Sequence, residues 1–226
     1  MLRKMNRIAT TLLLSVCIAA GMQAQSLKQL GTSVDDIVPQ GWSHYEVTGD
    51  LNKDGQADLA VMVTPNFKER IVTRDDGYER NCNQPVFAVY FATADGKLKQ
   101  WKQYGEVLPA NDIDNEFCSW NVNLDITERG VLNIAVQPEC SAGSYFTHID
   151  RYSYRFQNGD FHLIGMENED IQRNTGNVTV NSENYLTWKR QVKKSNFSED
   201  TPPTEKWTRL TKKPLEKLGA RKLGEE

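Results

Sequence analysis

The residues best suited to chemistry in this sequence are the oxygen-bearing side chains of one nine-residue loop, which runs from Asp50 to Asp58. Asp50, Asn52, Asp54 and Asp58 stand at positions 1, 3, 5 and 9 of the loop, and a glycine stands at position 6. Calcium takes about six to eight oxygen ligands, which alternate residues of a tight loop can supply if a glycine allows the chain to bend. With the backbone carbonyl of Gln56 as a further ligand, the spacing predicts a bound Ca²⁺ ion.

The residues around this loop indicate a structural ion and not a regulatory sensor. A helix-loop-helix calcium sensor needs a bidentate glutamate at position 12, and position 12 here is Val61. The flanking segments, 43–48 and 59–64, are rich in β-prone residues and predict strands. Three carboxylates crowded into one turn repel each other unless a cation lies among them. We therefore expect the ion to hold a loop between two strands.

The rest of the chain also predicts strands almost throughout. Turn signals at 94–97, 128–130 and 158–160 separate apolar or alternating runs, and Asn158-Gly159 is a strong hairpin signal. Further strands are expected at 86–93, 98–104, 118–140 (as a hairpin), 145–157, 161–166 and 185–192, with a helical turn at 34–38 and a polar loop at 65–84. We predict a mainly β fold with few short helices. It is a single antiparallel domain, built as a sandwich, a partly open barrel or a truncated propeller-like stack.

The loop also carries a resemblance to a known family. The segment 49–59 resembles the calcium loop of FG-GAP repeats, found in integrin α-chain propellers and in many secreted bacterial proteins. There the loop joins two strands of a blade and recurs, whereas here it occurs once. The whole chain resembles small secreted bacterial proteins of unknown function that share a Pro-x-Gly-Trp opening (39–42), one such loop, and a late segment like 152–165. That resemblance implies the fold and export, and it brings no catalytic residue.

The first 24 residues are typical of an export signal. Arg3, Lys4 and Arg7 precede an apolar run, and a cut is expected between Ala24 and Gln25. Lipoprotein processing at Cys17 is a second, less favoured, interpretation. The expected organisation is a signal peptide (1–24), a β domain (25–194), and a linker with a basic C-terminal arm (195–226). We expect a periplasmic or secreted protein without a transmembrane segment.

Charge is unevenly distributed along the chain. The 27 Lys and Arg are outnumbered by 30 Asp and Glu, and residues 25–186 hold 24 of the acidic side chains against 13 basic ones. Phosphate contacts need clustered Lys and Arg, so an acidic body argues against a nucleic-acid partner. A protein or glycan partner is expected instead, and the sequence does not specify it or the oligomeric state.

Three cysteines remain after the signal peptide is removed, in a compartment that permits disulfides. Cys118 and Cys140 lie eleven residues on either side of Arg129, so a symmetric hairpin places them opposite each other. We prefer a Cys118–Cys140 disulfide, with Cys82 free; Cys82 can compete for either partner if the register slips.

Other side chains have less specific interpretations. Five tryptophans and Tyr104 are expected mainly in packing, with Trp101 the best candidate for an exposed sugar-stacking ring. His148 can share a metal ligand set with Asp150 only if both lie on one strand face. The acidic cluster at 112–116 is interpreted as a solvated loop.

No nucleophile, phosphate-binding or zinc-protease motif occurs in the sequence. The leading hypothesis is therefore an exported, non-catalytic binding or interaction protein with a structural calcium ion. A calcium-dependent hydrolase or a carbohydrate-binding module acting on envelope or host polymers is the alternative.

Overall fold

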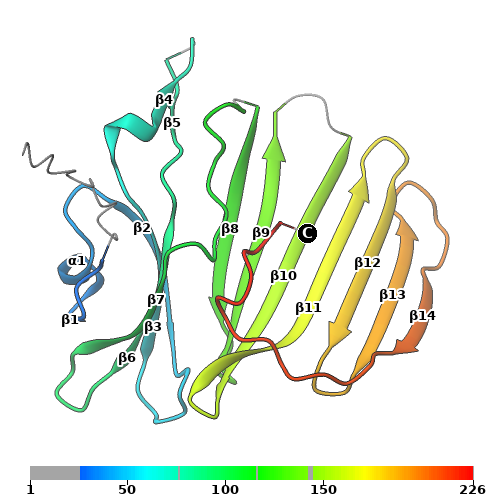
Figure 1. Cartoon of the computed structure of the whole chain (residues 1–226). Helices are drawn as coiled ribbons and strands as arrows, with labels where there is room; N and C mark the ends of the chain where they lie inside the picture. Colours follow the sequence, from blue (N-terminus) through cyan, green and yellow to red (C-terminus); the bar gives the residue numbers. More distant parts are fainter. Residues whose placement is uncertain (1–25, 76, 116, 142–144, 226) are drawn as a thin grey trace, which may run out of the picture.

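The protein forms two antiparallel β-sheets and a separate hairpin, with little helix (Figure 1). A computed structural model describes residues 26–75, 77–115, 117–141 and 145–225, so the expected signal peptide and Cys17 lie outside the described residues. The elements are β1 (Leu30–Gly31), α1 (Val34–Ile37), β2 (Ser43–Gly49), β3 (Asp58–Thr64), η1 (Lys68–Arg70), β4 (Ile71–Thr73), β5 (Glu79–Asn81), β6 (Val86–Ala92), β7 (Leu98–Tyr104), β8 (Cys118–Ile126), β9 (Val131–Cys140), β10 (Phe146–Gln157), β11 (Asp160–Gln172), β12 (Asn177–Asn184), β13 (Lys189–Asn196) and β14 (Thr204–Arg209). The predicted antiparallel β fold is confirmed.

The smaller sheet has the strand order β1-β7-β6-β3-β2. Its central strands β3 and β6 are apolar along nearly their whole length, which allows both of their faces to be buried. Residues alternate between the faces of a strand: Val61 and Ala88 face α1 and the N-terminal residues, while Ala60 and Val89 face the second sheet. The helical turn expected near residue 34 is present, and the hydroxyl of its capping residue Ser33 accepts a hydrogen bond from the Asp36 amide at 3.3 Å.

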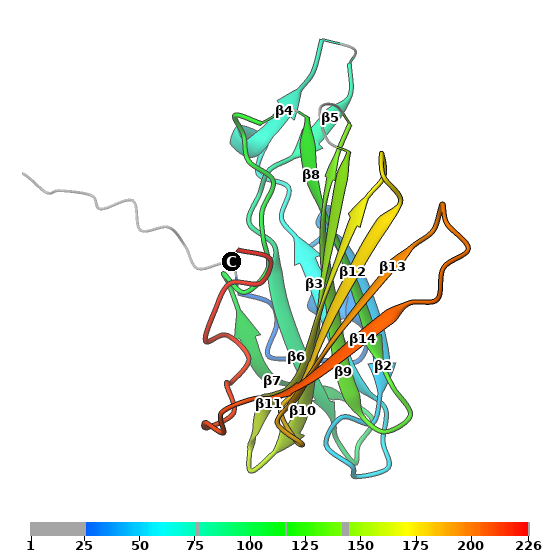
Figure 2. The same cartoon turned by 90° about the vertical axis from the view of Figure 1, so that its right-hand side faces the viewer.

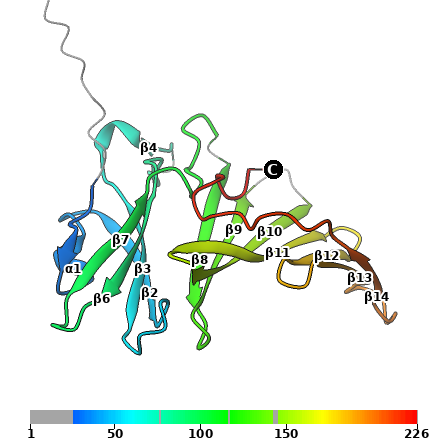
Figure 3. The ribbon, with the colours of Figure 1, turned by 60° about the horizontal axis from the view of Figure 1, so that its bottom comes forward.

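The larger sheet follows the chain strand by strand, in the order β8-β9-β10-β11-β12-β13-β14, and it curls along its width (Figure 3). The β10–β11 pairing contains a bulge. Ser153 lies opposite Gly165 and Tyr154 lies opposite Leu163, so Ile164 is an extra residue in β11. Bulges of this kind bend a strand and increase its twist.

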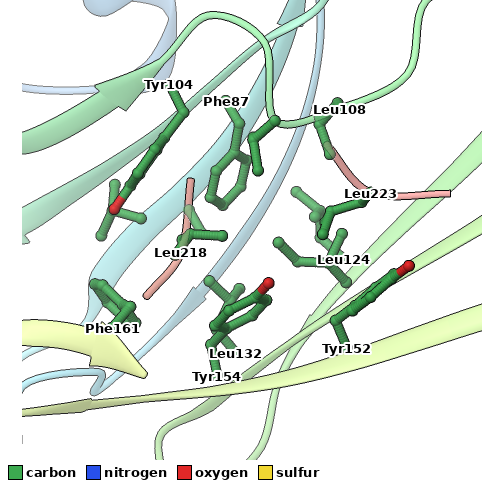
Figure 4. Close-up of a cluster of buried hydrophobic side chains, with 14 of the residues drawn as sticks. Phe87, Tyr104, Leu108, Leu124, Leu132, Tyr152, Tyr154, Phe161, Leu218 and Leu223 are labelled. Carbon is green, nitrogen blue, oxygen red and sulfur yellow. The ribbon is translucent and has the colours of Figure 1, made fainter. Parts of the chain in front are cut away.

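The two sheets enclose the main core. They come together where β2 lies beside β8, and there a Cβ on Gly49 would lie 2.5 Å from a methyl group of Ile126. Figure 4 shows how rings and leucines from both sheets meet between them, among them Phe87 of β6, Tyr154 of β10 and Phe161 of β11. The aromatic and aliphatic surface buried here holds the sheets face to face.

The C-terminal residues differ from the expected linker and arm. Residues 204–209 form strand β14, and the chain then crosses one face of the large sheet toward β7 (Figures 1 and 2). The Leu163 amide donates to the Glu216 carbonyl at 2.8 Å, and Leu218 and Leu223 are 1% and 0% exposed within the core. These two leucines cover the open side of the core. The apolar surface that they bury holds the segment against the sheets, although the residues around them are largely basic.

Three further segments depart from the expected strands. Residues 65–84 form η1 and the β4–β5 hairpin where a loop was expected. β12 occupies residues 177–184, for which no strand was expected, and residues 185–188 form the turn into β13 where a strand was expected to begin. Strands β12 to β14 extend beyond the core, and every residue of β14 is exposed.

Candidate functional site

The β2–β3 loop folds around the carboxylate of Asp50. Its Oδ1 accepts hydrogen bonds from the amides of Lys53 and Asp54, at 2.7 and 3.1 Å, and its Oδ2 accepts from the amide of Gly55 at 3.1 Å. Lys53 and Gly55 both have left-handed backbone conformations, with φ of 69° and 86°. Two such residues so close together bring successive amides toward one point. The loop is therefore a compact turn organised by the first residue of the calcium pattern.

Asp58, the last residue of the pattern, is fully buried. Its Oδ2 accepts from the amides of Leu51 and Asn52, at 2.9 and 3.2 Å, and its Oδ1 accepts from the amide of Ala92 at 2.9 Å. Burial raises the pKa of Asp58, and these three hydrogen bonds act against that rise. No basic side chain of the described residues forms an ion pair with it.

Asn52, Asp54 and Gln56 lie toward solvent. Asp54 accepts from the Gln56 amide at 2.8 Å and from the side chain of Asn52 at 3.0 Å, and these bonds lower its pKa. The structure thus brings all five predicted ligand residues into one turn. Within the described residues, however, no three His, Cys, Asp or Glu side chains converge as a ready set of metal ligands.

The loop rests on the β8–β9 turn of the other sheet. A Cβ on Gly130 would overlap the Asp50 carbonyl oxygen and would lie 2.8 Å from both Cε and Nζ of Lys53. The Lys53 ammonium reaches the Glu128 carbonyl at 3.4 Å, away from the loop carboxylates. The loop is therefore a contact between the two sheets, which the nine-residue pattern alone did not reveal.

The predicted disulfide between Cys118 and Cys140 is confirmed. The two residues are direct partners in the β8–β9 register and their Cα atoms are 4.1 Å apart. Cys82 is free, as preferred from the sequence, and the structure shows that it is buried. It lies beside Arg80, whose guanidinium donates to the backbone carbonyls of Asp112, Asn115 and Cys118. Of the acidic loop at 112–116, Asp112 and Asp114 are exposed as expected, and Glu116 lies outside the described residues.

Trp101 is half-covered and does not present a flat stacking ring. It is 39% exposed, and its ring lies 5.5 Å from Phe91 and 5.3 Å from Phe156 in tilted and edge-on arrangements. A sugar-stacking residue would need an open ring face, which the Phe91 and Phe156 contacts restrict. Trp207, on β14, is more exposed at 59%.

His148 and Asp150 do share a strand face, and they meet a third residue that the sequence did not single out. The His148 Nε2 lies 2.8 Å from Asp150, and its Nδ1 lies 2.6 Å from Asp170 on β11. Burial lowers the pKa of His148, but the two carboxylates outweigh this and raise it above 6.5. Asp150 is 2% exposed and also accepts from the side chain of Asn168. Both ring nitrogens are thus engaged by carboxylates.

Among the described residues, no helix has the length and apolar character needed to cross a membrane. Comparison of the chain with protein-family models, with curated proteins and with solved structures gives no match.

Proposed function

We propose that this chain is an exported, non-catalytic binding protein whose β2–β3 loop holds a structural calcium ion. The observation that carries the calcium assignment is Asp58, a fully buried carboxylate for which the described residues provide no cationic partner. A buried carboxylate is costly unless it is hydrogen-bonded and its charge is balanced. Three amides supply the hydrogen bonds of Asp58, and a calcium ion in the loop would balance its charge. Asp50, Asn52 and Asp54 supply further oxygens in the same turn, and the loop resembles FG-GAP calcium loops.

Export and the absence of catalysis rest on the sequence, through its basic and apolar leader and its lack of nucleophile and zinc-protease motifs. The competing class, a calcium-dependent hydrolase, would need a pair of carboxylates open to substrate. The best-placed pair, Asp150 and Asp170, is engaged by His148, and Asp150 is buried. This arrangement favours binding over hydrolysis.

The test is thermal unfolding of the purified protein in calcium and in a calcium chelator, together with calorimetric titration of the ion. Calcium at about 100 times its Kd should add about 2.7 kcal/mol of stability. That corresponds to a rise in melting temperature of about 5–10 °C for a chain of this size. Magnesium, which demands tighter octahedral geometry, should give a smaller rise.

Asp54→Ala removes one exposed oxygen donor without disturbing the core, and it should abolish most of the calcium response. Asp95→Ala is the matched control, because Asp95 is also an exposed turn aspartate but belongs to the β6–β7 turn and not to the nine-residue loop. Identical melting curves in calcium and chelator, with no heat of binding, would refute the calcium assignment.

A further inference from the structure

A cavity of about 630 Å³ opens on the outer face of the large sheet, on the side away from the core. One wall is the β8–β9 turn with Glu128 and Arg129, and the opposite wall is the β12–β13 turn with Asn184 and Leu186. Arg155 of β10 lies between them. The volume of the cavity is within the range of about 300–1,000 Å³ that is typical of small-molecule sites.

The hollow follows from the β10–β11 bulge and a glycine. Asn133, Ser153, Gly165 and Asn184 are successive cross-strand partners on four neighbouring strands, so they form one row across the outer face. Because Gly165 has no side chain, the row is open in the middle. The bulged residue next to it, Ile164, is 8% exposed and lines the base of the cavity.

The cavity carries two arginines that are available to a ligand. Neither Arg129 nor Arg155 forms an ion pair or side-chain hydrogen bond with another described residue. By contrast, Arg151, in the adjoining cavity, pairs with Glu167 and Glu169 at 3.3 and 2.8 Å. Glu128 is the one carboxylate in the lining of the larger cavity, so the lining carries a net positive charge.

The remaining polar side chains of the cavity can form hydrogen bonds with hydroxyl groups of a ligand. Ser153 donates its proton to Asn133 at 2.8 Å, which leaves its lone pairs free to accept. Asn184 accepts from the amides of Leu186 and Thr187 at 3.0 and 2.9 Å, which leaves its side-chain NH₂ free to donate. Leu186, 46% exposed, and Ile164 offer apolar surface to carbon–hydrogen faces. Backbone groups in the middle of this sheet are already paired, so side chains must recognise the ligand and strand addition is excluded.

We propose that this cavity binds the carboxylate of a uronic acid, either free or as a residue of an acidic polysaccharide, with Arg129 and Arg155 holding the carboxylate. Arginine matches a carboxylate through paired, charge-assisted hydrogen bonds. The sugar hydroxyls reach Ser153 and Asn184. The inference rests on the proposed function, since it assigns a ligand to a binding protein. It also places the ligand next to a turn that contacts the calcium loop. The β8–β9 turn that carries Arg129 also supports that loop through Gly130.

The experiment is calorimetric titration of the calcium-loaded protein with galacturonate, trigalacturonate, acetate and galactose. Saturable binding of galacturonate, with weaker acetate and galactose, is expected. Tighter binding of trigalacturonate would identify a polymer as the source of the ligand, and equal binding would identify the free acid. Arg155→Gln and Arg129→Gln should each raise the Kd about tenfold or more, because each removes a charge-assisted contact. Gly165→Val should block binding by filling the cavity.

Lys206→Gln is the control. Lys206 is an exposed cation of β14 on the face of the large sheet opposite to the cavity, so its substitution should leave the Kd unchanged. Each variant is titrated at the same number of degrees below its own melting temperature. A loss of binding then cannot be caused by a larger unfolded fraction. Absence of saturable uronate binding, or an unchanged Kd in both arginine variants, overturns the inference. Calcium stabilisation without uronate binding would leave the calcium assignment standing, and uronate binding without calcium stabilisation would leave the cavity assignment standing.

Discussion

Gly130→Ala is the substitution that best isolates the contact between the β2–β3 loop and the β8–β9 turn. Gly130 has a left-handed backbone, with φ of 66°, and its amide donates to the Thr127 carbonyl at 2.8 Å. Gly96 occupies the same position in the β6–β7 turn, with φ of 76° and an amide bond to Thr93 at 2.8 Å. The two turns differ in their surroundings. An added Cβ at Gly96 meets no atom within 4 Å, whereas one at Gly130 meets the β2–β3 loop.

The expected magnitudes follow from this difference. A left-handed alanine costs about 1–2 kcal/mol in either turn. At Gly130 the methyl group also overlaps the Asp50 carbonyl oxygen, which is backbone and cannot rotate away as the Lys53 side chain can. Overpacking of this kind costs about 1–3 kcal/mol more. Gly130→Ala should therefore lower the free energy of unfolding by about 2–5 kcal/mol, against about 1–2 kcal/mol for Gly96→Ala.

Urea unfolding followed by tryptophan fluorescence measures both variants, in calcium and in chelator. Only Gly130→Ala should also shrink the calcium-dependent part of the stability, because only it displaces Asp50. Equal losses for the two variants in calcium would refute the contact between the turn and the loop. A Gly130→Ala protein that keeps the full calcium response would separate the contact from the ion site.

Three further predictions test other parts of the structure. The pKa of His148 is raised in the folded state, so its contribution to the free energy of unfolding is complete below about pH 6.5 and is lost as the pH rises through the folded pKa. Thermal melts from pH 5 to 9 should therefore show a decline in melting temperature that His148→Gln removes. Replacing both Cys118 and Cys140 by serine should lower the unfolding free energy by about 3 kcal/mol in urea titrations, because the bridge closes a loop of 22 residues. Leu218→Ala should cost about 2–5 kcal/mol in the same assay, whereas Leu186→Ala, at an exposed turn, should cost under about 1 kcal/mol.

The sequence predicted those parts of the fold that are encoded locally. Hairpin turns with glycine in a left-handed conformation mark β6–β7, β8–β9 and β10–β11, and the apolar runs of β3 and β6 need no distant information. β12 could not be predicted in this way. It lies beyond the core, both of its faces are partly exposed, and its alternation is short, because only Val178 and Val180 are apolar and the run from Asn181 to Asn184 is polar. The C-terminal leucines gave no periodic signal either, since they fill a gap between two sheets that form earlier in the chain.

The side-chain clusters show the same division. The spacing within the loop from Asp50 to Asp58 identifies five residues that do lie in one turn. Asp170 was missed beside His148 because its position depends on the bulge. Counting outward from the Asn158 turn without a bulge would pair His148 with Glu169, and the extra residue Ile164 shifts the pairing by one. A one-residue shift moves a different side chain onto the shared face.

The β8–β9 turn connects the two proposals physically. One side of the turn meets Asp50 and Lys53, and the other side lines the outer cavity through Glu128 and Arg129. An ion that orders the loop would therefore restrict Arg129 before a ligand arrives, and ordering a binding group in advance raises affinity. Linkage then requires the reverse effect of equal size: a ligand that orders Arg129 must raise the calcium affinity by the same factor. Measuring calcium binding with and without galacturonate, and uronate binding with and without calcium, should give one coupling factor from both directions. A factor of one in both titrations would mean that the turn is already rigid and that the two sites act independently.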